Sequence, residues 1–133
     1  MKVSGLTPLI FVFDMPASVA FYRDVLGFEV AMQSQPGDQF GWALLRMGGA
    51  ELMLNTAYED HERPPVPDAA RWAGHGDTTL YIGCPNVDEA YEYLKSKGVA
   101  VKKPAVTYYG MKQLTLTDPD GYGVCFQHPA NAG

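Results

Sequence analysis

The side chains best suited to hold a metal ion or to act as a nucleophile are three histidines and two cysteines. They are His61, His75, His128, Cys84 and Cys125. The cysteines form neither a CxxC pair nor a disulfide framework, so we expect both to be small buried hydrophobic residues. We expect His61 and His75 to be exposed residues of a long connection and His128 to be a residue at a strand end, all without a catalytic role. A nucleophilic cysteine needs a nearby base, and the sequence places none beside Cys125.

A second chemical pattern is the alternation of side-chain types along the predicted strands. Leu52 and Leu54 alternate with Glu51, Met53 and Asn55, and successive side chains of a strand point to opposite faces. The aliphatic set should pack under helices. The other face continues with neutral polar and aromatic residues, which are Thr79, Tyr81, Gln113, Thr115, Thr117, Cys125 and Gln127. A face that merely meets water would carry Lys and Glu, so this set indicates a ligand pocket, although one face of many antiparallel sheets is simply wet.

The elements that must position these strands occur twice in the same order. Each half contains a strand, a helix and three further strands. The first helix is capped by Asp14, with Pro16 in its first turn, and stopped by Gly27, whereas the second runs from Asn86 to Gly98. The expected strands are 6–13, 28–33, 40–47 and 50–56, then 78–84, 99–102, 109–117 and 122–128. The order βαβββ, repeated, predicts an α+β fold built from a duplicated module.

The length of 133 residues and the hydrophobic share of 47% fit one globular domain. We expect a single domain over 1–133, with modules at 5–56 and 78–128. The connection 57–77 is long for a compact domain, so it is either a functional loop or a mobile linker, and it has a short helix near 68–72.

The charge pattern excludes several partners. The net charge is −5 and no cluster of Lys and Arg exists, which disfavours nucleic acid. No apolar run approaches the roughly 20 residues of a membrane span, and the start lacks the long apolar stretch of a secretory signal. A cytoplasmic location is therefore expected. An acidic protein also attracts cationic ligands modestly.

Three segments resemble one known family. Residues 14–28 (DMPASVAFYRDVLGF) look like the first-helix signature of the vicinal-oxygen-chelate superfamily, and residues 86–98 (NVDEAYEYLKSKG) resemble its second helix. Tyr109-Gly110 and residues 118–122 (DPDGY) resemble its last hairpin. The superfamily includes glyoxalase I, extradiol dioxygenases, fosfomycin-modifying enzymes and bleomycin resistance proteins. The resemblance covers nearly the whole chain and implies two βαβββ modules that form a curved mixed sheet.

Enzymes of this superfamily hold a divalent metal with four side chains, usually His, Gln or Glu. By resemblance, the four positions here are Thr7, Glu51, Thr79 and Cys125. Threonine hydroxyls are poor ligands, and Cys125 would select soft ions without a partner thiolate. One carboxylate does not replace the three or more protein ligands that such an ion needs. We therefore expect no metal and no other cofactor, unless a shift in strand register brings His75 closer to Thr79.

Without metal ligands, the chain most resembles the metal-free members of the superfamily, the bleomycin resistance proteins, which sequester a flat cationic antibiotic at a dimer interface. Aromatic faces and a carboxylate suit such a ligand. The candidate binding residues are Trp42, Glu51, Met53, Asn55, Trp72, Tyr81, Tyr109 and Gln113. Alternative interpretations remain for three of them: Trp42 as a core or dimer residue, Trp72 as a loop residue over the core, and Glu51 as a surface or salt-bridged carboxylate.

Two other functions stay open. One is a metal-dependent lyase, dioxygenase or thiol transferase, for which Glu51 alone supplies too little. The other is a pocket that is vestigial or that binds an unrelated metabolite, because a fold does not determine a function. A homodimer is expected in any of these cases, since sheets of this size leave apolar edge surface that needs a partner.

Overall fold

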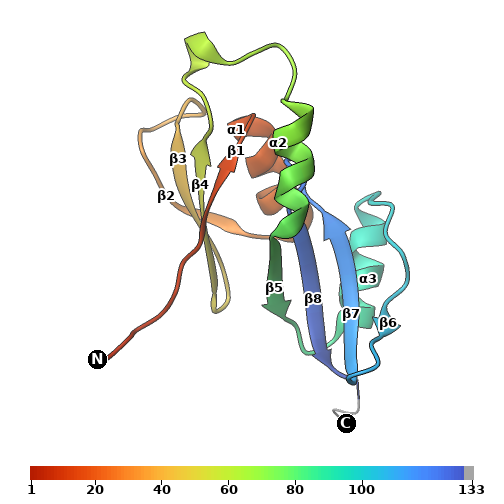
Figure 1. The fold of residues 1–133 in the computed structure, drawn as a ribbon. Coiled ribbons are helices and arrows are strands. Elements are labelled where there is room, and N and C mark those ends of the chain that lie inside the picture. Colours follow the sequence, from red (N-terminus) through yellow and green to blue (C-terminus); the bar gives the residue numbers. More distant parts are fainter. Residues whose placement is uncertain (131–133) are drawn as a thin grey trace. The chain divides into compact units, whose positions relative to one another are not determined.

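A computed structural model describes residues 1–130 of the chain. The chain divides into two compact units, one over residues 1–67 and one that begins at Asp68 (Figure 1). The elements of the first unit are β1 (Leu9–Val12), α1 (Met15–Val19), η1 (Ala20–Leu26), β2 (Glu29–Gln33), β3 (Trp42–Met47), β4 (Ala50–Thr56) and η2 (Asp60–Glu62). Those of the second are α2 (Ala69–Gly74), η3 (His75–Asp77), β5 (Thr79–Gly83), α3 (Val87–Ser96), β6 (Ala105–Val106), β7 (Met111–Thr117) and β8 (Gly123–Pro129). The predicted α+β class and repeated βαβββ order are confirmed.

The first unit is a mixed four-stranded sheet in the order β1-β4-β3-β2, in which β1 runs parallel to β4. Its aliphatic face is buried, as predicted, and α1 packs against β4. The core consists of Ile10, Val12, Ala43, Leu45, Leu52 and Leu54 from the strands and Met15, Val19, Tyr22 and Leu26 from the helical segment. The opposite face of this sheet, called the open face below, carries the side chains that alternate with this core set.

The helix of the first unit begins and ends as expected but changes character in its second half. The Asp14 carboxylate accepts a hydrogen bond from the Ala17 amide at 3.3 Å, and Gly27 ends the segment at φ 103°. From Ala20 the α-helix widens into the π-helical segment η1, in which the Gly27 amide bonds to the Tyr22 carbonyl at 3.1 Å. Side-chain spacing alone does not distinguish this wider turn from an α-helix, so the prediction of one uniform helix was wrong here.

The second unit repeats the arrangement, with sheet order β5-β8-β7-β6 and β5 parallel to β8. The helix α3 packs on β7 and β8 and buries Val87 and Leu94. Asn86 caps it by accepting from the Glu89 amide at 3.1 Å, and Gly98 follows at φ 79°. Both features were predicted. The short helix in the connection also forms, as α2, with the Asp68 carboxylate accepting from two backbone amides.

One strand lies elsewhere than predicted. Residues 99–102 are not in a strand, and the edge strand β6 covers Ala105–Val106 instead. Pro104 lacks an amide hydrogen and restricts the residue before it, so pairing with β7 begins only after it. The other strand boundaries lie within a few residues of their predicted positions. None of the described helices has the length and apolar character that a bilayer crossing demands.

Candidate functional site

The open face of the first sheet is an ordered array of side chains from β1, β4 and β3. Residues opposite one another in neighbouring strands share a face, so the register defines its rows. One row is Phe11, Asn55 and Trp42, and the next is Leu9, Met53 and Leu44. Phe11 is 42% exposed and Leu9 41% exposed. This face is therefore more apolar and more aromatic than the predicted set of Glu51, Met53, Asn55 and Trp42.

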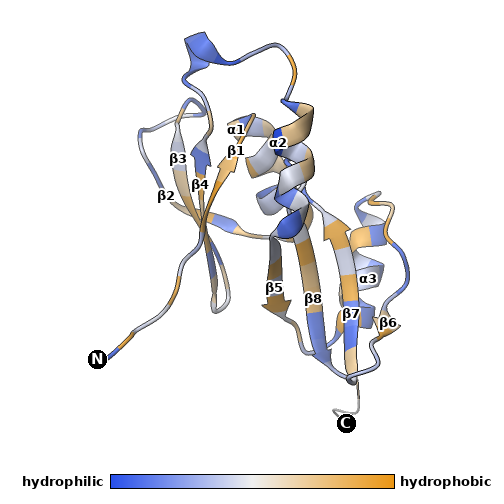
Figure 2. Ribbon diagram, in the orientation of Figure 1, coloured by the Kyte–Doolittle hydropathy of each residue, from blue (hydrophilic) through white to orange (hydrophobic). Residues whose placement is uncertain are grey.

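Sequence reasoning missed Phe11 and Leu9, although a signal was present. β1 is hydrophobic along its whole length, as Figure 2 shows. A strand without polar alternation indicates apolar residues on both faces. Ile10 and Val12 fill the core, so Leu9 and Phe11 must lie on the other side.

A third row of the open face is held by ionic contacts around Glu51. Arg46 donates from Nε at 2.9 Å and from Nη2 at 2.8 Å to Glu51 Oε2, while the Thr7 hydroxyl donates to Oε1 at 3.1 Å. Hydrogen bonds from Arg46, and then from Thr7, lower the pKa of the Glu51 carboxyl below its ordinary value of 4.5. Glu51 is therefore a salt-bridged carboxylate, which was one of the alternatives left open for it. Its partner Arg46 was not among the predicted site residues.

The arrangement around Glu51 does not fit the divalent metal that the superfamily enzymes bind. Both Glu51 oxygens accept hydrogen bonds, and the Arg46 guanidinium would repel a cation placed beside them. In the second unit, Thr79 is exposed, and burial raises the pKa of the Cys125 thiol, which disfavours the thiolate that a metal requires. Within residues 1–130, no three His, Cys, Asp or Glu side chains gather closely enough to hold an ion.

The state of Glu51 gives a pH-dependent prediction. Arg46→Met should raise the Glu51 pKa back toward its ordinary value, because the principal donors are lost. A carboxyl with a lowered folded pKa contributes stability above its unfolded pKa and loses it as the pH falls through the folded value. The stability of Arg46→Met should therefore change less than that of the parent protein below about pH 4.5. NMR titration of the Glu51 carboxyl carbon and urea midpoints at several pH values test this.

The matched control removes an ion pair elsewhere in the first unit. Arg23 contacts its neighbour Asp24 at 2.8 Å, and both side chains are exposed. Arg23→Met should leave the Glu51 titration as it is in the parent protein. An unshifted Glu51 titration in Arg46→Met contradicts the account.

The corresponding face of the second sheet carries the residues predicted for it. Tyr81 is 59% exposed and lies opposite Cys125, which is buried between Tyr81 on β5 and Thr115 on β7. Gln113 donates to Gln127 at 2.9 Å and to the Tyr109 hydroxyl at 3.1 Å. The second unit thus presents an exposed tyrosine and a hydrogen-bonded network of neutral polar side chains. Whether these residues bind a ligand stays a prediction.

Trp72 and His75 belong to the structure around one turn of the second unit. The Trp72 indole donates to the Pro119 carbonyl at 3.0 Å. His75 stacks on Tyr122 with ring centroids 4.1 Å apart, and its Nδ1 lies 2.6 Å from the Asp120 carbonyl. The expectation that His75 is an exposed loop residue was wrong, because these contacts half-bury it. The hydrogen bond to Pro119 likewise makes Trp72 a residue that covers this turn.

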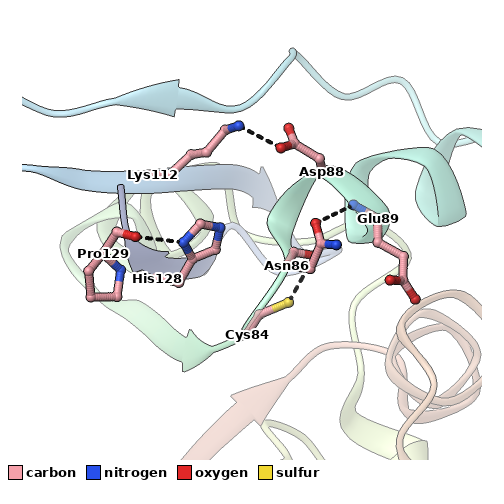
Figure 3. Close-up of polar contacts among 7 residues, drawn as sticks. All are labelled: Cys84, Asn86, Asp88, Glu89, Lys112, His128 and Pro129. Atoms are coloured by element: carbon pink, nitrogen blue, oxygen red, sulfur yellow. Dashed lines mark hydrogen bonds and ion pairs between the residues drawn. The ribbon is translucent and has the colours of Figure 1, made fainter. Parts of the chain in front are cut away.

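The remaining titratable candidates lie apart from these sheet faces. His61 is exposed, as expected, 3.7 Å from Glu62. Figure 3 shows Cys84 and His128 near the start of α3: the Cys84 thiol donates to the Asn86 carbonyl at 3.5 Å, and His128 Nδ1 lies 2.8 Å from the Pro129 carbonyl. Cys84 is half-exposed, so the prediction that both cysteines are buried holds only for Cys125.

Comparison with a family model decides what this architecture is. Residues 6–126 match the model of the Glyoxalase/Bleomycin resistance protein/Dioxygenase superfamily. The chain belongs to this superfamily. The resemblance inferred from residues 14–28, 86–98 and 118–122 is therefore confirmed.

Several solved structures share the fold. TnmS3, an antibiotic binding protein from Streptomyces sp. CB03234, is 27% identical, with a TM-score of 0.68 over 97% of this chain and 98% of its own. A bleomycin resistance determinant encoded on the transposon Tn5 is 21% identical, with a TM-score of 0.72 over 96% and 98%. A glyoxalase/bleomycin resistance protein/dioxygenase from Nocardioides is 22% identical, with a TM-score of 0.74 over 100% and 88%. No protein of curated function matches the sequence significantly.

Proposed function

We propose that this protein binds a flat aromatic, positively charged small molecule on its open sheet face without a metal ion. The observation that carries the proposal is the row of exposed Phe11 and half-buried Asn55 and Trp42, next to exposed Leu9 and half-buried Met53. Rigid aromatic and apolar side chains with a few neutral polar groups are typical of small-molecule sites. The similarity to TnmS3, which binds an antibiotic, supports the same class of ligand.

The chemistry of the face determines which forces contribute to binding. Arg46 already pairs with Glu51, so stacking and apolar contact, rather than an ion pair to Glu51, supply the affinity on this face. The net charge of −5 favours cationic over anionic ligands through long-range attraction. An antibiotic of this shape is the ligand class that we infer, and sequestration in the cytoplasm is the corresponding role.

A homodimer is part of the proposal. Leu9 and Met32, on the two edge strands of the first sheet, are exposed and are joined across the open face by the apolar side chains of Met53 and Leu44. Contiguous apolar surface of this kind marks interaction sites on soluble proteins. A second copy that covers part of it would enclose a ligand on several sides.

Calorimetric titration with a matched pair of probes tests this function. Proflavine is a flat aromatic cation, and acridine has the same ring system but is uncharged at mildly basic pH. We expect proflavine to bind more tightly than acridine, with equal affinity in EDTA and in added Zn²⁺ or Mn²⁺. Gel filtration of the same samples should place the protein at about twice 14.6 kDa.

Variants locate the binding on the open face. Phe11→Ala should weaken proflavine binding about tenfold, because a stacking partner is lost. The control is Tyr93→Ala, which removes an aromatic side chain with the same 42% exposure from α3. Equal losses in the two variants, or binding that disappears on chelation, would overturn the proposal, and the second result would favour a metal-dependent enzyme.

A further inference from the structure

A cavity of about 210 Å³ lies in the first unit, and none of the residues of the open-face rows lines it. It forms at Phe13, the residue after β1, between the loop that joins β2 to β3 and the segment that follows β4. Phe40 comes from the first of these segments and Tyr58 from the second. Pockets that bind drug-sized ligands have volumes of about 300–1,000 Å³, so this smaller cavity suits one ring or one planar charged group.

The aromatic wall of the cavity, formed by Phe13, already contacts a planar cation of the protein itself, the Arg63 guanidinium. The Arg63 guanidinium lies over the Phe13 ring, 5.4 Å from its centroid, which is within the range of a cation–π contact. Arg63 Nη1 is also 3.9 Å from Asp14 Oδ1, and 39% of the Arg63 side chain is exposed. A planar cation thus rests on this wall through weak, solvent-exposed contacts, which an external cation of the same shape can displace.

The charges that line the cavity favour such an exchange. Asp38, Glu59 and Asp60 contribute three carboxylates, against the guanidinium of Arg63. Phe13 also contacts Tyr58 edge-on, with centroids 6.3 Å apart, so a second aromatic ring supports the wall. The lining therefore combines an aromatic surface for stacking with negative charge that Arg63 alone does not balance.

We propose that this cavity binds a planar guanidinium or amidinium group, and that Arg63 is an internal competitor for the same place. The proposal is independent of the function assigned to the open face, since none of the Phe11 and Leu9 rows lines the cavity. It assigns a cation site to the connection after β4, for which sequence analysis left open either a functional loop or a mobile linker.

Benzamidine is the probe, and benzamide, its uncharged counterpart, is the control ligand. Two-dimensional NMR titration should show benzamidine shifting the amides of residues 13, 38–41 and 56–63, with little effect from benzamide. Arg63→Gln should tighten benzamidine binding about two- to fivefold, because the competing cation–π contact is gone. Phe13→Leu, which keeps an apolar side chain but removes the ring, should weaken it.

The matched variant is Arg71→Gln on α2, which removes the same charge from the chain at a position outside the cavity. Its benzamidine affinity should equal that of the parent protein. The proposal is overturned if Arg63→Gln binds benzamidine no more tightly than Arg71→Gln does, if benzamide binds equally well, or if the shifted amides lie outside the cavity. Binding of proflavine by Phe11→Ala tests the open face separately, so failure of one site leaves the other result intact.

Discussion

Gly121→Ala is expected to destabilise the second unit by roughly 2–5 kcal/mol. Gly121 has φ 90°, a conformation that costs an alanine about 1–2 kcal/mol. A Cβ added at Gly121 would also lie 2.4 Å from the Trp72 carbonyl oxygen and 3.0 Å from its ring atom Cδ2. Because the nearest atom belongs to the backbone of α2, the helix must move, and overpacking of this kind costs a further 1–3 kcal/mol, about as much again.

Gly110→Ala is the matched control for the steric contact. Gly110 lies in the same unit at φ 86°, and a Cβ at this position would meet no atom of the described residues within 4 Å, its chain neighbours aside. Gly110→Ala should lower the free energy of unfolding only by the backbone cost of about 1–2 kcal/mol. Urea unfolding followed by Trp72 fluorescence in a Trp42→Phe background, checked by circular dichroism, measures both. Equal losses in the two variants would contradict the role assigned to the Trp72 contact.

The same turn explains why a single glycine has so large an effect. The buried Asp118 carboxylate accepts from the Asp120 amide at 2.8 Å and from the Tyr122 amide at 2.9 Å. Trp72 and His75 close over this turn through the Pro119 and Asp120 carbonyls. The turn that follows β7 is therefore hydrogen-bonded to α2 through Trp72 and to η3 through His75. A displacement at Gly121 disturbs both of these hydrogen bonds together.

Features set by local chemistry could be predicted from the sequence. Asp14 and Asn86 cap helices because their side chains reach amides three residues ahead, and Gly27 and Gly98 end them because glycine adopts positive φ without strain. The alternation in β4 likewise identified which of its side chains lie on the open face. Each of these inferences depends on residues only a few positions apart.

Features that depend on pairing between strands were harder to predict. Arg46 meets Glu51 because the Gly48-Gly49 turn sets the register in which these residues are opposite. That register was accessible from the turn, but the prediction considered each strand alone. The cavity was out of reach, since it requires Phe13, Phe40 and Arg63, from three separate segments, to converge in space.

Within the core of the first unit, truncation of Tyr22 should lower the free energy of unfolding most, because Tyr22 is the largest of the fully buried side chains. Its ring packs edge-on against Phe21 at 5.0 Å and against Phe28 at 5.8 Å between centroids. Its carbonyl accepts from the amides of Gly27 and Phe28 at 3.1 and 2.8 Å, where the π-helical segment ends and the chain turns into β2. The residue thus joins the helical segment to the sheet through both its ring and its backbone.

Tyr22→Ala should lower the free energy of unfolding by about 3–5 kcal/mol, because it leaves a ring-sized cavity in a region that the surrounding strands hold open. Phe21→Ala is the control. Phe21 is the half-exposed neighbour of Tyr22, so its truncation should lower the free energy of unfolding clearly less. Tyr22→Phe keeps the ring and should also lose much less than Tyr22→Ala. Urea unfolding followed by Trp42 fluorescence in a Trp72→Phe background reports on this unit alone, since these are the two tryptophans and each unit contains one. A loss in Tyr22→Ala no greater than in Phe21→Ala would mean that the strands of the first unit close over the missing ring, and that its core is held by the aliphatic face of the sheet.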